Sequence, residues 1–209
     1  MKIGFIGTGA ITTAMVEGLC TTENPPSDIV VSPRNKNKAE KLAARFDNVR
    51  IAGDNQIIVD ECDCIVLAVV PQIAEPVLRK LHFRKKQQII SVIAIKLISE
   101  IKSLVDPATD IIRAIPLPTA ARHMGPIAFF PYTSWADNLF SDIGDPIASA
   151  RYLLGGRAPS SPGAADSNGD GKIDPGDVVD LLCGFLWKTP SAPPLVSLSV
   201  FSATPKASS

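Results

Sequence analysis

The chain has 209 residues, enough for one large domain or for a medium domain followed by a small one. Its 21 Lys and Arg residues balance 21 Asp and Glu residues, so no basic excess indicates binding to nucleic acid or to a membrane surface. No apolar run approaches the roughly 20 residues of a membrane span. Met1-Lys2 leads directly into an apolar run without a signal-peptide pattern. We therefore expect a cytoplasmic protein, at least for the N-terminal part.

Residues 1–19 predict a strand, a glycine turn and a helix in immediate succession. Lys2–Ile6 is short, apolar and β-prone, Gly7-Thr8-Gly9 interrupts it, and Ala10–Leu19 has apolar residues at helical spacing. A strand that turns through glycines into a helix N-terminus presents backbone N–H groups to a pyrophosphate. Thr12 stands where the full dinucleotide fingerprint has a third small residue. An ordinary strand-to-helix turn is the alternative interpretation.

Strands and helices alternate through the rest of the N-terminal part. The regular alternation with short loops predicts an α/β fold with a doubly wound parallel sheet, Rossmann-like, whose ligand lies across the carboxyl edge. The predicted strands are Ile29–Val31, Val49–Ile51, Cys64–Val70, Gln88–Ile93 and Ile111–Ala114, with Ile127–Phe130 as a further candidate. The predicted helices are Lys38–Phe46, Asn55–Glu61, Gln72–Leu81 and a segment with Leu97, Ile101, Leu104 and Val105 on one face.

The end of the second predicted strand carries a hydroxyl followed by cations, in Ser32-Pro33-Arg34-Asn35-Lys36. An NAD-preferring site would place an acidic side chain here, on the ribose 2′-hydroxyl, whereas cations suit the 2′-phosphate of NADP. A solvated basic loop is the alternative interpretation of this segment.

Residues 1 to about 140 resemble the N-terminal domain of pyrroline-5-carboxylate reductase. The resemblance is carried by MKIGFIGTG followed by AMVEGL, by Asn55, by LAVVPQ from Leu67, by SVIA from Ser91, and by RAIPLP from Arg113 with Gly125 beyond. It implies hydride transfer from NAD(P)H to the imine carbon of a cyclic imino acid, the last step of proline biosynthesis. The expected cofactor is NADP, with NAD as the alternative, and the expected partner is this small-molecule substrate.

The resemblance also implies the cofactor contacts, although it identifies no catalytic residue. The family usually has a lysine at the position of Val70, a glycine directly after Ala94, where this chain has Ile95, and an asparagine at Leu117. Dinucleotide binding should survive these departures better than catalysis. The implied contacts are Ile6, Gly7, Thr8, Gly9, Ala10, Ile11, Ser32, Arg34, Asn35, Asn55, Ala68, Val69, Val70, Pro71, Ile93 and Ala94.

After Leu139 the sequence changes character, and the helical domain of the family is not recognisable. Residues 166–177 instead match a calcium loop, with oxygen ligands at five positions, a central glycine and a backbone carbonyl. A solvated acidic turn is the alternative. The predicted calcium ligands are Asp166, Asn168, Asp170, Lys172, Asp174 and Asp177, the last in place of the usual glutamate.

The segment around this loop resembles a dockerin-type module, which implies a protein partner. One helix is predicted from Asp145, as N-cap before Pro146, to Leu154, and another carries an apolar stripe from Val178 to Leu186. The predicted domains are therefore 1–139, 140–189 and a Pro/Ser/Ala-rich tail at 190–209. An alternative to the reductase is a non-catalytic fusion of a dinucleotide-binding domain with this calcium-binding interaction module.

The four cysteines lack the spacing of a metal or redox site. Cys62 and Cys64 are two residues apart at the start of an apolar strand, which would place both on one face. We expect Cys20, Cys62, Cys64 and Cys183 to be free, partly buried thiols.

Overall fold

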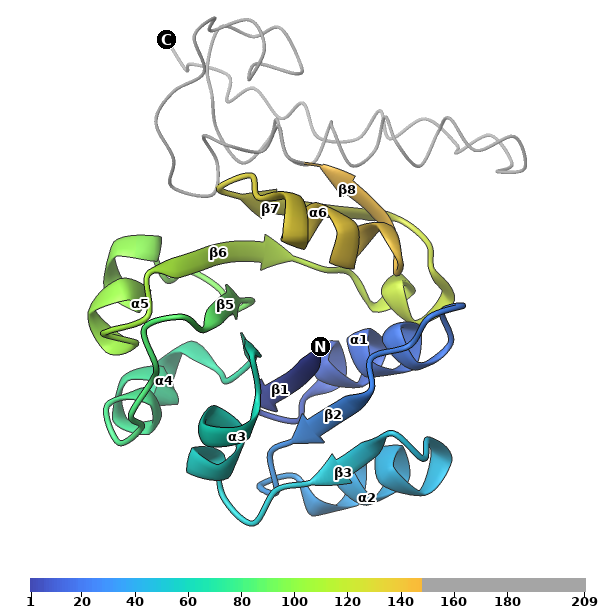
Figure 1. Ribbon diagram of the computed structural model, residues 1–209, viewed down its shortest axis with the longest axis horizontal. Coiled ribbons are helices and arrows are strands. Elements are labelled where there is room, and N and C mark those ends of the chain that lie inside the picture. Colours follow the sequence, from blue (N-terminus) through green and yellow to red (C-terminus); the bar gives the residue numbers. More distant parts are fainter. Residues whose placement is uncertain (148–209) are drawn as a thin grey trace, which may run out of the picture.

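The computed structural model describes residues 1–147, which form an eight-stranded sheet with helices on both faces (Figure 1). The predicted calcium ligands at 166–177, Cys183 and the tail at 190–209 lie outside the described residues. None of the helices within residues 1–147 is both long enough and apolar enough to cross a bilayer. The strands are β1 (Lys2–Ile6), β2 (Asp28–Val31), β3 (Val49–Ile51), β4 (Cys64–Leu67), β5 (Gln88–Ser91), β6 (Asp110–Ile115), β7 (Pro126–Phe130) and β8 (Asp145–Ile147). The helices are α1 (Ala10–Cys20), α2 (Lys36–Arg45), α3 (Asn55–Glu61), α4 (Pro71–Leu78), α5 (Ile98–Leu104), the 3₁₀ helix η1 (Pro118–Arg122) and α6 (Ser134–Ser141).

The strand order is β3-β2-β1-β4-β5-β6-β7-β8, and the six strands from β3 to β6 in this order are mutually parallel. This confirms the doubly wound, Rossmann-like sheet predicted from the alternation of elements. The direction of winding reverses between β1 and β4, where such sheets leave a crevice beyond their carboxyl ends. We call the edge at which β1 to β6 end the carboxyl edge.

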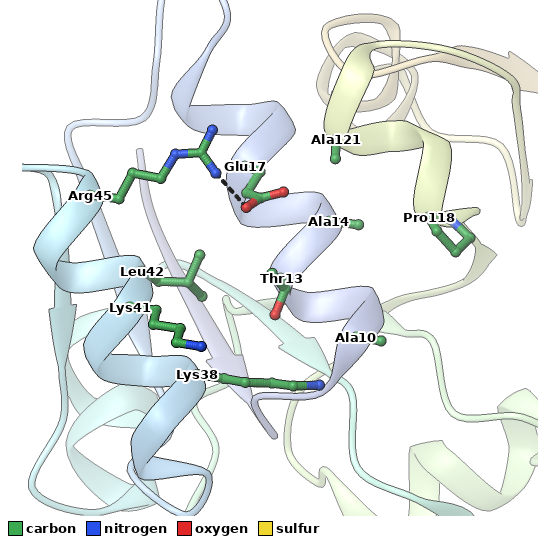
Figure 2. A pocket seen from close by; sticks show the side chains of 10 residues that line it. All are labelled: Ala10, Thr13, Ala14, Glu17, Lys38, Lys41, Leu42, Arg45, Pro118 and Ala121. Atoms are coloured by element: carbon green, nitrogen blue, oxygen red, sulfur yellow. Dashed lines mark hydrogen bonds and ion pairs between the residues drawn. The ribbon is translucent and has the colours of Figure 1, made fainter.

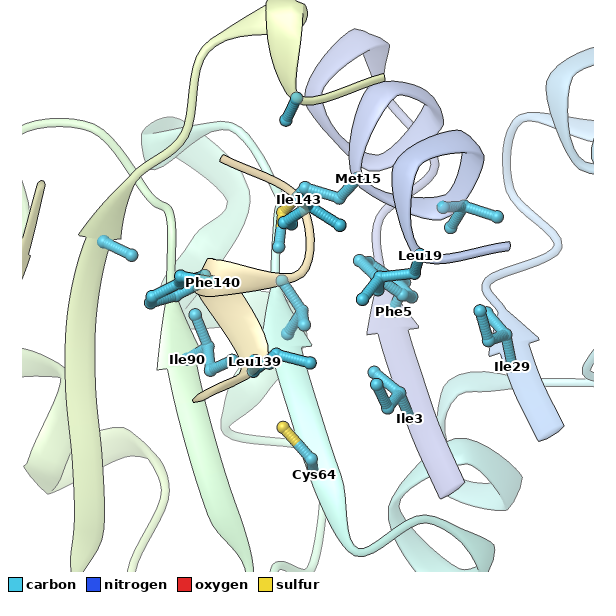
Figure 3. Packing of buried hydrophobic residues seen from close by; sticks show 14 of the residues in the cluster. Ile3, Phe5, Met15, Leu19, Ile29, Cys64, Ile90, Leu139, Phe140 and Ile143 are labelled. Carbon is cyan, nitrogen blue, oxygen red and sulfur yellow. The ribbon is translucent and has the colours of Figure 1, made fainter. Parts of the chain in front are cut away.

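Two apolar clusters hold helices against opposite faces of the sheet. On one face, Phe5 of β1 and Ile29 of β2 pack with α1, α2 and α6 (Figure 3). On the other face, Ile65 of β4 and Ile89 of β5 pack with α3, α4 and α5. All four residues of β4 are fully buried, which explains why this central strand is continuously apolar in sequence.

The chain from residue 126 adds two strands to the sheet: β7 confirms the candidate strand at Ile127–Phe130, whereas β8 was not predicted. β7 is antiparallel to β6, and β8 is parallel to β7 with Asp145 opposite Pro126. Asp145–Ile147 is therefore a strand and not the first turn of the predicted helix, which was a wrong prediction at these three residues. The N–H of Asp145 donates to the carbonyl of Gly125, so the segment is bound to the sheet edge rather than capping a helix.

The boundary predicted at residue 139 falls inside α6. Leu139, Phe140 and Ile143 are buried in the same cluster as Ile3 and Phe5 (Figure 3). The unit that contains the sheet thus continues at least to Ile147, the last described residue.

Two predicted strands end earlier than expected because the chain turns into loops at the carboxyl edge. β4 ends at Leu67, and Val70 is already the N-cap of α4, with Pro71 at its first position. β5 ends at Ser91. Cys62 follows α3 and packs on the face of Ile65, whereas Cys64 packs on the opposite face, so the expectation that both share one face was wrong.

The loop after β5 contains a backbone conformation that isoleucine rarely adopts. Ile95 has a φ of 68°, in the left-handed region, and its side chain is 85% exposed. A β-branched residue is an outlier there, because its Cβ crowds the following carbonyl. The glycine that the resemblance leads us to expect at this position would relieve this strain.

Replacing Ile95 with glycine should leave stability unchanged or raise it. Glycine removes a steric cost of roughly 1–2 kcal/mol and adds an entropic cost of roughly 0.5–1 kcal/mol, and little apolar burial is lost. Thermal unfolding should therefore show a midpoint equal to the wild type or about 2–4 °C higher. The control is Ile93→Gly, which removes a buried side chain and should cost roughly 3 kcal/mol or more. If Ile95→Gly lost as much stability as Ile93→Gly, the result would contradict the claim that the backbone at Ile95 is strained.

Candidate functional site

The carboxyl edge is organised around the glycine turn between β1 and α1. Gly7 has a φ of 102°, and a Cβ added there would lie 2.6 Å from the carbonyl oxygen of Ala68. Gly9 is the N-cap of α1, contributes no side-chain cap, and a Cβ added to it would meet nothing within 4 Å. The N-terminus of α1 thus has no side-chain cap and has open space beside Gly9, which suits a bound anion.

Two threonine hydroxyls hold this turn in place. Thr12 is fully buried, and its Oγ1 donates to the carbonyl of Gly7 at 2.6 Å. Thr13 Oγ1 donates to the carbonyl of Gly9 at 3.0 Å. The departure from the fingerprint at Thr12 is thus accommodated by a hydrogen bond that fastens the helix to the turn.

A groove of about 470 Å³ opens above the turn and brings together many of the residues predicted to contact a cofactor. It lies between the ends of β1, β2 and β4, where the strand order reverses. Lys36 and Ile73 also line it; they were not predicted, since their position depends on how α2 and α4 pack and not on a motif. The lining residues are Gly7, Thr8, Gly9, Arg34, Asn35, Lys36, Ala68, Val69, Val70 and Ile73.

Arg34 connects this groove to a second pocket of about 290 Å³, which is also lined by Ser32, Asp54 and Asn55. The guanidinium of Arg34 is exposed and makes no hydrogen bond or ion pair with residues 1–147. It is therefore available to an anionic ligand.

The other polar side chains predicted at this position are engaged within the protein. Ser32 is buried and its hydroxyl donates to Asn55 Oδ1 at 2.8 Å, while the Ser32 carbonyl accepts from Thr8 Oγ1 at 2.7 Å. Asn35 caps α2, because its Oδ1 accepts from the N–H of Lys38 at 3.4 Å. These bonds tie the ends of β1 and β2 to α3 and shape the pocket around Arg34.

A third pocket, of about 260 Å³, lies beyond the ends of β5 and β6. It brings Ile11 of α1 next to Ile93 and Ala94, three residues predicted to contact a cofactor. Arg113 of β6 lines the same pocket and was not predicted as a site residue. Its place in the motif RAIPLP was visible in the sequence, but its register beside β5 was not.

The remaining predicted contacts lie at the margins of these pockets. Ile6 is fully buried beneath the turn and could reach a ligand only through its backbone. Pro71 begins α4 behind Val70. Ala10 lines a different pocket, of about 570 Å³, between α1, α2 and η1 (Figure 2). That pocket lies along helix flanks, and there Arg45 pairs with Glu17 at 2.6 Å.

Three of the cysteines lie in the part of the chain that the structure describes. Cys20, Cys62 and Cys64 are free thiols, as predicted. Burial raises the pKa of Cys20 and of Cys62 to about 11 and raises the pKa of Cys64 further, so all three are protonated at neutral pH. Within residues 1–147, no cluster of three or more His, Cys, Asp or Glu side chains is arranged to hold a metal ion.

Comparison with known proteins finds one matching family model and several relatives of part of the chain. The family model described as NADP oxidoreductase, coenzyme F420-dependent, matches residues 2–95. A pyrroline-5-carboxylate reductase of Methanosarcina acetivorans is 32% identical over 122 residues, covering 55% of this chain and 43% of the relative. Pyrroline-5-carboxylate reductase 3 of Danio rerio is 29% identical over 119 residues, covering 56% of this chain and 41% of the relative. The chain thus spans less than half the length of these relatives.

Solved structures of the same enzyme share the fold. The pyrroline-5-carboxylate reductase of Streptococcus pyogenes has a TM-score of 0.61 at 24% identity, covering 93% of this chain and 82% of that chain. The Plasmodium falciparum pyrroline carboxylate reductase, solved with NADP bound, has a TM-score of 0.60 at 20% identity, covering 70% of this chain and 56% of that chain. This chain is therefore similar in part of its sequence, and in fold, to pyrroline-5-carboxylate reductases.

Proposed function

We propose that this chain binds NADPH along the carboxyl edge and reduces the imine carbon of a cyclic imino acid such as pyrroline-5-carboxylate. The observation that carries the proposal is the glycine turn: Gly7 and Gly9 line the groove, the space beside Gly9 is open, and no side chain caps α1. The amides of such a turn suit the paired phosphates of a dinucleotide. The sequence similarity to pyrroline-5-carboxylate reductases supports the choice of substrate class.

The groove and its neighbouring pockets suggest an orientation for the cofactor. Arg34 stands at the end of β2, where the adenosine ribose would lie, and supplies a cation for a 2′-phosphate. Ile93 and Ala94 stand at the end of β5, on the opposite side of the turn, where the nicotinamide would lie. Val70 is 57% exposed between these positions and offers an apolar surface to the nicotinamide half.

In the proposed reaction, the carbon–nitrogen double bond of the imine accepts a hydride from NADPH at carbon and a proton at nitrogen, giving a cyclic secondary amine and NADP⁺. The residues of the carboxyl edge position the donor ring and keep one of its faces against the protein. The proton that the nitrogen takes up comes from solvent water.

Gly9→Ala should weaken NADPH binding while leaving the fold intact. The new methyl meets no protein atom but projects into the space over the helix N-terminus, where a phosphate must approach closely. We expect at least about a tenfold loss of affinity, in the range of other overpacking effects, measured by fluorescence titration of NADPH. The unfolding midpoint, measured without nucleotide, should change by no more than a few degrees. Unchanged affinity with an unchanged midpoint would contradict the proposed phosphate position.

Arg34→Gln should reduce the preference for NADPH over NADH. Losing one charge-assisted contact to the 2′-phosphate is expected to cost about tenfold or more in NADPH affinity, with NADH affinity changed less than about twofold. The matched control is Arg79→Gln on α4, which removes an exposed cation that pairs with Glu75. Equal losses for both nucleotides would place the 2′-phosphate away from Arg34.

Turnover tests the catalytic part of the proposal. The purified full chain, mixed with NADPH and pyrroline-5-carboxylate, should oxidise NADPH, followed as loss of absorbance of the reduced nicotinamide. Tight NADPH binding without oxidation would reject the reductase activity and leave a nucleotide-binding domain.

The calcium loop stays a prediction from the sequence, since its ligands lie outside the described residues. An ion that binds only the folded protein stabilises it by mass action. Calcium should therefore raise the unfolding midpoint of a transition in the full chain, and Asp166→Ala should abolish this rise. A chain whose unfolding is indifferent to both calcium and chelator would refute the prediction.

A further inference from the structure

Arg113 is a half-buried cation that the proposed cofactor contacts do not use. It lies on β6 within the parallel part of the sheet, with Ser91 of β5 as its register partner. Within residues 1–147 its guanidinium makes no hydrogen bond and no ion pair. Ser91 Oγ is the one buried side-chain nitrogen or oxygen atom of the described residues without a hydrogen-bond partner, so the Arg113 guanidinium stays in contact with solvent and is available to an anionic ligand.

The surroundings of Arg113 do not supply the missing partner. Glu100 acts on Arg113 through its charge, but its carboxylate is engaged with the Lys96 ammonium at 2.9 Å and with the N–H of Leu97 at 2.7 Å. Ser91 lies on the same face of the sheet, is fully buried, and its hydroxyl has no hydrogen-bond partner among the described residues. Burial lowers the pKa of Arg113, as expected for a cation whose charge is incompletely compensated.

The pocket that Arg113 lines is the one that holds Ile11, Ile93 and Ala94. Its other walls are mainly apolar, from Val92, Ala114 and Ile115, so a charged ligand group would find its recognition at the guanidinium. A hydride acceptor must lie against the nicotinamide, and the proposed function places that ring at Ile93 and Ala94. A substrate in contact with the ring is therefore within reach of this pocket.

We propose that Arg113 binds the carboxylate of the imino acid substrate, at a subsite between the ends of β5 and β6. This inference rests on the proposed function. The planar guanidinium presents parallel N–H donors that match the two oxygens of a carboxylate, and it stays charged throughout the physiological pH range. Binding there would hold the imine ring by its charged substituent while the apolar walls accommodate its methylene groups.

The test compares L-proline, the expected product, with L-prolinamide, in which a neutral amide replaces the carboxylate. Calorimetric titrations use the full chain in the presence of NADP⁺. The wild type should prefer L-proline by about tenfold or more, and Arg113→Gln should lose about 10- to 100-fold in L-proline affinity and with it the preference. Arg113→Lys keeps the charge without the paired donors, so its L-proline affinity should lie between those of the wild type and Arg113→Gln. Arg79→Gln should behave as the wild type.

Unfolding midpoints of the Arg113 variants establish whether they fold. If Arg113→Gln does not fold, Arg113→Lys still tests the inference. Full L-proline affinity in a folded Arg113 variant would overturn the inference, as would failure of the wild type to bind L-proline. NADPH binding and oxidation with pyrroline-5-carboxylate, measured on the same preparation, separate the two proposals. If the wild type oxidises NADPH while Arg113 proves irrelevant to L-proline, the reductase proposal stands and this inference falls.

Discussion

The close approach of Gly7 to the backbone of Ala68 is the constraint on which the carboxyl edge depends. β1 and β4 are adjacent at the point where the winding reverses, and their ends can meet only if the first residue after β1 lacks a side chain and takes a positive φ. The same turn directs the chain into α1, and the bond from Thr12 to Gly7 fixes the helix on it. The open space over Gly9 follows from this geometry.

Three pockets lie next to one another along the carboxyl edge. Arg34 marks one end of this row of pockets, the glycine turn its middle, and Ile93 with Arg113 the other end. Cations thus stand at both ends with apolar surfaces between them. An extended ligand with a phosphate at one end, and a second ligand with a carboxylate at the other, would each find a complementary charge.

The departures from the related reductases alter this same edge. Val70 and Ile95 are exposed apolar residues at the positions where the resemblance leads us to expect a lysine and a glycine. A missing lysine removes a cation near the nicotinamide position, which leaves Arg113 as the cation of the adjoining pocket. Ile95 has a left-handed backbone conformation, which suits a glycine better than a β-branched residue.

Sequence patterns predicted the parallel part of the fold because its causes are local. Buried strands such as β4 are continuously apolar, and glycine turns are visible as such. They did not predict β8, because Asp145-Pro146 also suits a helix start, and only the pairing with β7, distant in sequence, decides between the two. The glycine turn and Arg34 could be found from motifs. Arg113 could not, since its importance arises from the register with Ser91 and the pocket between two strands.

The most direct measurement is a crystal structure of the full chain with NADPH. The account predicts the pyrophosphate against the N–H groups that follow Gly9, the adenosine ribose beside Arg34, and the nicotinamide near Ile93. A nucleotide bound in the pocket between α1, α2 and η1 instead, or a groove above Gly7 left empty at saturating NADPH, would contradict it.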